Sequence, residues 1–363
     1  MLNGRLPAID IELTERCNNA CVHCYINLPA NAKAARDQEL TTDEVKGILC
    51  QAADLGCMVV RFTGGEPLLR PDFAEIYAYT RRLGMRVILF TNACLLTQRI
   101  IDLFKGLPPM EKIEVTSYGM HPQSYAAITL QTGGFEAFQR GVNLLIENNI
   151  PFVIKSVLLP ANQDDVGELE KWAASLPGMT DPPTTAVFFE LRNRRDDPGK
   201  NEQIRKLRYS PQSGVDFMLR DPSKFEEFRQ NFLLGVDELP GAGLFACGAG
   251  DGRLSVDAYG RIQPCLEMRA PEITLPKGTL LRLALEEFQS LRKMNSENVE
   301  YLERCAKCFL RNICEQCPAK AWSETGSLDT PIEYYCEVTH ELARRLGWLA
   351  GSEKSWEIKD WRS

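Results

Sequence analysis

Short apolar segments alternate with segments of helical periodicity along the first half of the chain. Six apolar segments are predicted as strands, at residues 9–13, 59–63, 86–90, 113–116, 152–158 and 186–191. Between them, apolar residues recur at helical spacing within residues 41–56, 72–83, 98–105, 135–146 and 164–176. Strands that alternate with helices predict an α/β fold with a parallel sheet covered by helices. Six units favour a partial (β/α)6 barrel, similar to a TIM barrel but short of its eight strands.

Polar and reactive residues follow the carboxyl ends of these predicted strands. The first strand leads into three cysteines, the second into Gly64-Gly65-Glu66, and the third ends near Asn92. The fourth ends at Ser117, Lys155 lies within the fifth, and Glu190 lies within the sixth. Chemistry in parallel β/α folds gathers at this edge of the sheet. We therefore expect these side chains to share one site.

Composition and charge exclude several classes of function. The chain is 44% hydrophobic and 25% charged, as in an ordinary globular protein. A formal net charge of -7 argues against nonspecific nucleic-acid binding. No apolar run approaches the roughly 18 residues of a membrane span, and no apolar signal segment follows Met1. The predicted location is the cytoplasm, with neither nucleic acid nor membrane as partner.

Thirteen cysteines in a long chain with no sign of secretion favour metal or cluster ligation over disulfides. Cys17, Cys21 and Cys24 have the spacing C-x3-C-x2-C. A [4Fe–4S] cluster normally takes four thiolates, so three would leave one iron open to a substrate or cofactor. The isolated Cys50, Cys57 and Cys94 are interpreted as small buried hydrophobic residues.

The Gly64-Gly65-Glu66 motif has its own physical interpretation. Two glycines permit close approach of the backbone to a ligand. The Glu66 carboxylate can accept charge-assisted hydrogen bonds from an ammonium group. The alternative for Glu66 is an ordinary turn residue.

With both motifs in place, residues 9–191 resemble the radical S-adenosylmethionine (SAM) superfamily. The resemblance implies a [4Fe–4S] cluster on Cys17, Cys21 and Cys24, with SAM bound to the fourth iron through its amino and carboxylate groups. It also implies reductive cleavage of SAM to methionine and a 5′-deoxyadenosyl radical. The residues expected at the cofactors are His23 and Tyr25 in the cluster loop, Gly64, Gly65 and Glu66 toward the SAM amine, and Ser117 on the fourth strand. Asn92 and Lys155 are further expected contacts, Lys155 toward the SAM carboxylate, with a structural role as the alternative for both.

Residues 241–340 resemble the SPASM extension of peptide-modifying radical SAM enzymes. The cysteines that carry this resemblance are Cys247, Cys265, Cys305, Cys308, Cys314, Cys317 and Cys336. The last spacing of the central run is x2, where the family usually has x3. The resemblance implies two auxiliary iron–sulfur clusters of the [4Fe–4S] type. Cys305, Cys308, Cys314 and Cys336 would hold the outer one. Cys247, Cys265 and Cys317 would hold the inner one, which has an open or noncysteine position.

Zinc is the competing interpretation of these cysteines. Cys305-x2-Cys308 with Cys314-x2-Cys317 also suits a tetrahedral zinc site. Seven thiolates, however, make one four-ligand site and one three-ligand site rather than two closed zinc sites.

Four regions are predicted: residues 1–191 as the radical SAM partial barrel, 192–240 as a linker, 241–346 as the small SPASM domain and 347–363 as a polar tail. The linker is either solvated or, through its arginines, in contact with an acidic or peptide substrate. The tail contains Trp356 and Trp361 and has no assigned role.

The resemblance favours a peptide or protein substrate, modified after translation in the maturation of a peptide natural product or peptide-derived cofactor. Only 16 residues precede Cys17, so a separate small protein is expected to bind any leader peptide. Flavodoxin or ferredoxin is the expected electron donor. Glu190, Arg192, His121 and Glu267 are catalytic candidates by position alone. The nearer alternative is oxidation or decarboxylation of a small molecule or tetrapyrrole, and the more distant one is a nonenzymatic zinc-binding scaffold.

Overall fold

The structure is a computed structural model that describes residues 4–179, 183–187, 197–233 and 239–358. The catalytic candidates Glu190 and Arg192 lie outside the described residues, as does Trp361. The sixth predicted strand, 186–191, is described only to residue 187, where it forms the end of β8 (Thr184–Val187).

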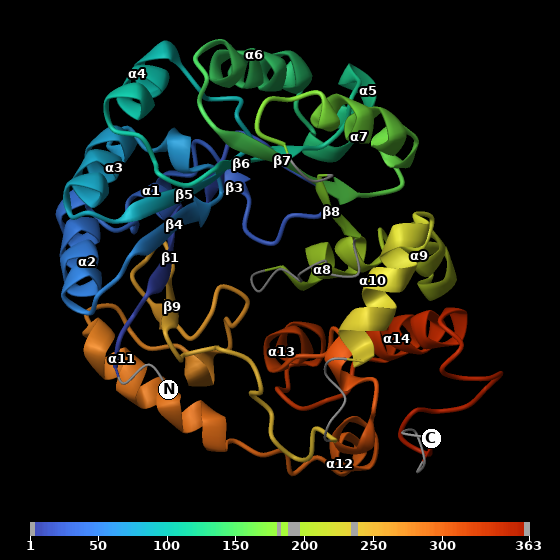
Figure 1. The fold of residues 1–363 in the computed structure, drawn as a ribbon. Coiled ribbons are helices and arrows are strands. Elements are labelled where there is room, and N and C mark those ends of the chain that lie inside the picture. Colours follow the sequence, from blue (N-terminus) through green and yellow to red (C-terminus); the bar gives the residue numbers. More distant parts are fainter. Residues whose placement is uncertain (1–3, 180–182, 188–196, 234–238, 359–363) are drawn as a thin grey trace.

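Six parallel strands form the body of the sheet. They are β1 (Ala8–Thr14), β4 (Val59–Gly64), β5 (Arg86–Thr91), β6 (Ile113–Ser117), β7 (Phe152–Leu158) and β8, paired in that order. Their curved arrangement inside a ring of helices is visible in Figure 1. The predicted α/β fold with a parallel sheet is confirmed.

An outer layer of helices covers these strands: α2 (Thr42–Asp54), α3 (Phe73–Arg82), α4 (Gln98–Gly106), α5 (Pro122–Thr129), α6 (Gly134–Glu147) and α7 (Val166–Ala174). Each buries apolar side chains, and all but α5 coincide with a segment in which the apolar spacing predicts a helix. At the start of α2, the Thr41 hydroxyl accepts a hydrogen bond from the Glu44 amide, and the Glu44 carboxylate accepts one from the Thr41 amide, so the predicted capping box is present.

Two strands from the C-terminal part extend the same sheet. β9 (Arg253–Val256) pairs in parallel with the edge of β1 opposite β4, and β10 (Ile262–Gln263) pairs antiparallel with β9. The full order is β10-β9-β1-β4-β5-β6-β7-β8. The first strand of the chain is therefore an interior strand of an eight-stranded sheet.

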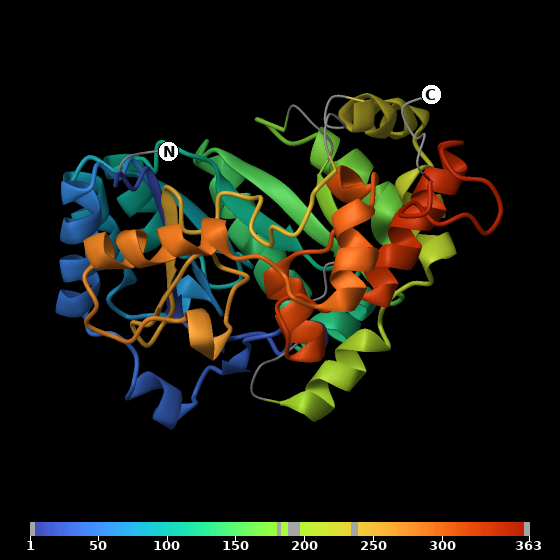
Figure 2. The same ribbon diagram turned by 90° about the horizontal axis from the view of Figure 1, so that it is seen from below.

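The remaining helices lie beside the barrel (Figures 1 and 2). They are α8 (Pro198–Arg205), α9 (Pro211–Met218), α10 (Pro222–Leu233), α11 (Leu281–Phe288), α12 (Val299–Glu303), α13 (Pro318–Thr325) and α14 (Glu333–Arg345). Val215 of α9 packs with Tyr335 and Leu342 of α14 in a second hydrophobic core. In the described residues no helix is long and apolar enough to cross a membrane.

Candidate active site

The loop with the first three cysteines is fixed at both ends. The short strands β2 (Arg16–Cys17) and β3 (Leu28–Pro29) pair in parallel where it begins and ends, and the small helix α1 (Lys33–Arg36) follows. Within the loop, the amides of Ala20 and Val22 donate to the carbonyls of Thr129 and Ile128 at the end of α5, both at 2.9 Å. Backbone bonds therefore hold the loop without using the thiols.

The two glycines of the second motif bring β4 against the cysteine loop. A Cβ on Gly64 would lie 2.2 Å from the Thr14 carbonyl oxygen, and one on Gly65 would lie 2.1 Å from the Arg16 carbonyl oxygen. Gly64 also has φ +124°, which disfavours any side chain. The Glu66 amide then donates to the Arg16 carbonyl at 2.9 Å. The two glycines thus let the backbones of the two motifs pack directly against each other. This contact is in addition to the ligand contact that the sequence predicts for them.

Glu66 is fully buried and held by three hydrogen bonds. Its Oε1 accepts from the Leu68 amide at 3.1 Å and the Thr91 hydroxyl at 2.8 Å, and its Oε2 accepts from the Asn92 amide at 2.8 Å. Burial raises the pKa of this carboxyl to about 7, although the hydrogen bonds oppose the shift. A buried carboxylate fixed in this way suits a bound ammonium or amine group.

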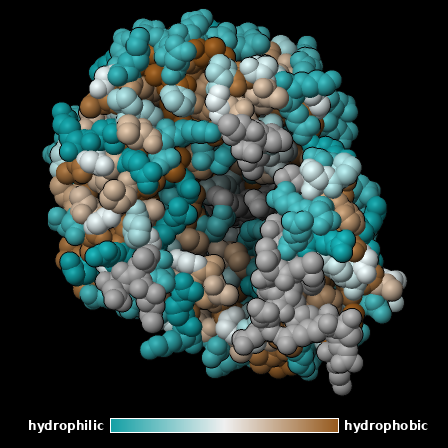
Figure 3. Space-filling view, in the orientation of Figure 1, coloured by the Kyte–Doolittle hydropathy of each residue, from teal (hydrophilic) through white to brown (hydrophobic). Residues whose placement is uncertain are grey.

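The first two motifs and several strand ends line one open cavity with about 1310 Å³ of empty space, including its mouth. Cys17, Cys21, His23, Cys24, Tyr25, Gly64, Gly65, Glu66, Asn92 and Lys155 are the predicted residues that line it. In the orientation of Figure 1, this face of the molecule is hollowed near its centre (Figure 3). The structure therefore brings together residues from four separate strand ends, as the sequence indicates.

Predicted residues differ in how they meet the cavity. The Asn92 side-chain amide donates to Asn18 Oδ1 at 2.9 Å and lies 3.8 Å from the Cys17 sulfur. Lys155 pairs with Glu114, and its Nζ lies 4.9 Å from the centre of the Phe90 ring. Ser117 is fully buried away from the cavity, with its hydroxyl donating to the Gly119 carbonyl at 3.2 Å.

Several lining residues were not predicted. Thr63, Thr116 and Ser156 sit at the carboxyl ends of strands, Asn27 lies in the cysteine loop and Leu266 comes from the C-terminal region. The alternation of side chains along a strand is the signal for the strand-end residues, because Thr116 faces the cavity where its neighbour Ser117 faces away. No local signal marks Leu266, since its approach depends on the pairing of β9 with β1.

The chemistry of the loop fits a cationic metal cluster. Burial raises the pKa of the Cys17 and Cys21 thiols well above their usual value, so thiolates here need a bound positive charge to be stable. Burial lowers the pKa of His23 to about 4, which keeps its imidazole neutral. Three thiols and a neutral ring at one end of an open cavity form a suitable donor set for a cluster with one exposed iron.

A buried ionic network connects this site to the C-terminal region. Arg269 donates to Glu12 and to Glu15, the latter at 3.4 Å, and Tyr259 donates to Glu15 at 2.9 Å. The Arg269 guanidinium also lies 5.0 Å from the centre of the Tyr25 ring in the cysteine loop. No motif of the sequence indicates this arginine.

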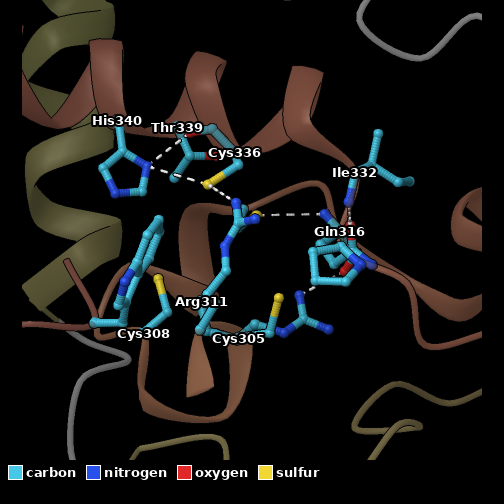
Figure 4. A pocket seen from close by; sticks show the side chains of 12 residues that line it. Cys305, Cys308, Arg311, Gln316, Ile332, Cys336, Thr339 and His340 are labelled. Carbon is cyan, nitrogen blue, oxygen red and sulfur yellow. Dashed lines mark hydrogen bonds between the residues drawn. The ribbon is translucent and has the colours of Figure 1, made fainter. Parts of the chain in front are cut away.

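Four of the C-terminal cysteines line a second cavity, with about 390 Å³ of empty space. They are Cys305, Cys308, Cys314 and Cys336, the set predicted for the outer cluster. Figure 4 shows the sulfurs of Cys305, Cys308 and Cys336 directed into one space, with His340 beside Cys336. Arg304 and Arg311 also line the cavity and supply positive charge near the sulfurs.

The remaining predicted residues lie in three places. Burial raises the pKa of Cys265 to about 12, and the charges of the nearby Glu267 and Cys317 add to this shift. Cys247 is exposed, on a turn beside Pro264, whose carbonyl accepts from the Gly250 amide at 2.9 Å. Glu267 lies near Cys265 and Cys317.

His121 lies away from the cavity. It precedes α5 on the exposed surface, where its Nε2 is 3.1 Å from Glu168. This catalytic candidate is not among the residues that line the cavity, and it pairs with a surface carboxylate.

Comparison with known proteins adds independent evidence. Residues 11–173 match the family described as the Radical SAM superfamily. The AdoMet-dependent heme synthase of Methanosarcina barkeri (strain Fusaro / DSM 804) is 28% identical over 342 residues, which cover 90% of this chain and 94% of that protein. The PqqA peptide cyclase of Rhizobium meliloti (strain 1021) is 27% identical over 321 residues, covering 85% of this chain and 78% of that protein.

The fold is also similar to that of a solved structure, SuiB from Streptococcus suis. The structure bound to S-adenosylmethionine gives a TM-score of 0.64 at 14% identity, covering 92% of this chain and 75% of that chain. The structure bound to the precursor peptide SuiA gives 0.63 at 15% identity, covering 92% and 76%.

Proposed function

We propose that this radical SAM enzyme, whose residues 11–173 match the Radical SAM superfamily, modifies a peptide substrate after abstraction of a hydrogen atom. Its cofactors are a [4Fe–4S] cluster and SAM. The observation that carries the proposal is the open cavity lined by the three cysteines and Glu66 together with Lys155 and Ser156. Ligand sites are concave and carry a few convergent polar groups, and this cavity has both features.

The proposal gives each part of the site a role. Bound at the cluster, SAM would supply a 5′-deoxyadenosyl radical on one-electron reduction, and the protein would provide orientation and exclusion of water. Cys17, Cys21 and Cys24 would hold the cluster, and Glu66 would accept a hydrogen bond from the SAM amine. Gly64 and Gly65 keep this carboxylate against the cluster loop, and Asn92 orients the loop through Asn18.

Charge in the cavity supports a peptide. Among the described lining residues the cationic side chain is Lys155, and it is already paired with Glu114. A substrate with several carboxylates would need more cationic partners. A largely neutral peptide segment needs none, and the fold similarity to a protein solved with its precursor peptide agrees with this choice.

A tetrapyrrole is the second candidate substrate. The observation that favours it is the identity to the Methanosarcina barkeri heme synthase, which extends over 90% of this chain.

We further propose that the C-terminal cysteines hold two auxiliary iron–sulfur clusters rather than zinc. A single zinc ion needs four donors converging on one point. In the part of the chain that the structure describes, no three His, Cys, Asp or Glu side chains converge in this way. Thiolates of a cluster bind different irons and need not converge on one point, and four cysteines line one cavity here. Flavodoxin or ferredoxin would supply the electrons.

Anaerobic turnover tests the proposed substrate. The purified enzyme is incubated with SAM, a reductant and either peptides encoded by short neighbouring genes or an iron tetrapyrrole, with and without a separate leader-binding protein. Formation of 5′-deoxyadenosine together with a mass change in a peptide is the expected result. A mass change in the tetrapyrrole alone would select the second candidate. Iron and sulfide without zinc in the purified protein is the result expected for the clusters.

A further inference from the structure

The C-terminal segment, residues 352–358, reaches the outer cysteine cavity. Ser355 is fully buried although residues 352–354 before it are exposed. Trp356 lines the cavity together with Cys305, Cys308 and Cys336. A polar segment thus turns inward at two adjacent residues, directly over the sulfurs.

Ser355 is bonded to both sides of the cavity. Its hydroxyl lies 2.9 Å from the Cys308 sulfur and 3.2 Å from His340 Nε2, and its amide also lies 3.2 Å from His340 Nε2. The Nδ1 of the same imidazole is 2.7 Å from the Cys336 carbonyl oxygen and 3.5 Å from the Cys336 sulfur.

The partners of His340 decide the directions of these bonds. A carbonyl oxygen can only accept, so Nδ1 carries the hydrogen and Nε2 accepts from the Ser355 amide. A thiolate can also only accept, so once Cys308 is a ligand it is the nearer of two acceptors for the Ser355 hydroxyl. Ser355 and His340 thus link Cys308 to Cys336 by hydrogen bonds.

Arg304 approaches the same sulfurs from the opposite side. Its Nη2 donates to the Cys336 sulfur at 3.4 Å, and Glu300 and Glu333 hold the guanidinium in place. The Trp356 ring covers this arginine, with the guanidinium carbon 4.8 Å from the ring centre. The same ring meets His340 edge-on at 5.2 Å between ring centres. Trp356 therefore covers both residues that contact Cys336.

We propose that residues 352–358 form a cap over the outer cysteine cavity, in which Ser355 and Arg304 hydrogen-bond to the thiolates of an iron–sulfur cluster and raise its reduction potential. The inference rests on the proposed assignment of the outer cysteines to that cluster. One-electron reduction adds one negative charge to the cluster. Hydrogen-bond donors and a cation at its sulfurs stabilise this added charge and so favour the reduced state.

The test uses the full chain with Cys17, Cys21 and Cys24 replaced by alanine, so that the first cluster does not contribute a signal. The protein is titrated anaerobically with dithionite and followed by electron paramagnetic resonance. The signal that disappears on Cys336→Ser identifies the outer cluster. Ser355→Ala and Arg304→Gln are each expected to shift its midpoint potential to a more negative value. Arg304→Lys keeps the charge and should stay closer to the parent value.

Matched controls separate the cap from general effects of substitution. Ser352→Ala changes an exposed serine of the same segment, and Arg282→Gln removes an exposed arginine of α11. Both should leave the potential unchanged. If Ser355→Ala does not retain the cluster, the midpoint potentials of Arg304→Gln and Arg304→Lys test the proposal instead. Arg304→Gln should again be more negative than the parent, and Arg304→Lys should be closer to it.

Two results would overturn the proposal and can be told apart. An outer-cluster signal whose potential is the same in the parent, Ser355→Ala and Arg304→Gln proteins would refute the cap while leaving the cluster in place. Absence of any signal that depends on Cys336 would refute the cluster assignment and, with it, the cap.

Discussion

Arg269, from the C-terminal region, forms a buried ion pair with Glu12 on the first strand. Neither side chain is exposed, and the guanidinium also covers the ring of Tyr25 in the cysteine loop. The pair therefore holds together three parts of the molecule that are far apart in the chain: β1, the cysteine loop and the segment after Cys265.

Replacement of this arginine should be costly. In Arg269→Gln, Glu12 and Glu15 would be left buried without their cationic partner, so the free energy of unfolding should fall by about 3–5 kcal/mol. Anaerobic urea denaturation measures the change. Arg345→Gln is the control, because its pairs with Asp216 and Glu341 lie at the surface and should contribute less than about 1 kcal/mol. Equal effects of the two variants would contradict the role given to Arg269.

Gly65 should tolerate no side chain. Gly65→Ala places a Cβ against the Arg16 carbonyl, so either β4 or the cysteine loop must move, at a cost of about 1–3 kcal/mol. We expect less iron in the first cluster, read from absorbance of a variant that lacks the C-terminal cysteines. Gly47→Ala is the matched control: a Cβ there, in α2, meets nothing within 4 Å. It should stabilise the protein by about 0.5–1 kcal/mol, as expected for glycine to alanine in a helix. Normal iron content in Gly65→Ala would show that the backbone near Arg16 can move to accommodate a Cβ without disturbing the cluster.

The raised pKa of Glu66 predicts a pH dependence of stability in iron-free protein. The carboxyl has a pKa of about 7 when folded, against 4.5 ordinarily. Between these values the folded state binds a proton that the unfolded state has lost, so stability from this group is complete below pH 4.5 and is lost as pH rises through about 7. The loss is at most about 3.5 kcal/mol, since one pKa unit corresponds to about 1.4 kcal/mol.

Denaturation at pH 5 and pH 7.5 tests this dependence on Glu66. Glu66→Gln cannot titrate, so its stability should fall less over this range than that of the parent protein, whatever the offset between the two at a single pH. Parallel pH profiles would contradict a raised pKa at Glu66.

Iron content should follow the grouping of the C-terminal cysteines. Cys336→Ser and Cys308→Ser should each remove the same cluster, with about four irons, and the double variant should lose no more than either single one. Cys265→Ser should remove further iron when it is combined with either Cys308→Ser or Cys336→Ser, because Cys265 is assigned to the inner cluster. Cys50→Ser, in contact with Tyr79 on the helical layer, should change nothing. Additive losses from Cys308→Ser and Cys336→Ser would show that they serve different sites.

Features set by neighbouring residues could be predicted from the sequence, and those set by distant pairing could not. The capping box of Thr41 and Glu44 depends on residues three apart, and it is present. The convergence of strand ends follows from parallel pairing alone, and it places Glu66 and Asn92 together. Which of Thr116 and Ser117 faces the cavity depends on the orientation of one strand, where a shift of one residue reverses every side chain.

The long-range features left no local trace. β9 pairs with a strand that lies more than 200 residues earlier, and its four residues look like many other short apolar segments. Arg269 and Trp356 depend on this pairing or on the path of the tail, and composition says nothing of either. The helices between residues 198 and 233 have weak apolar periodicity, because α9 buries few residues and α8 is mostly polar.

The interior position of β1 has a consequence for any attempt to divide the chain. A fragment that ends before β9 would present the backbone N–H and C=O groups of Ala8–Ile11 to solvent along a flat edge, beside the apolar side chains of Ile9 and Ile11. Such an open edge is a template for pairing with another chain. The barrel fragment would therefore tend to aggregate. In the full chain, β9 covers the edge of the first strand and prevents this pairing.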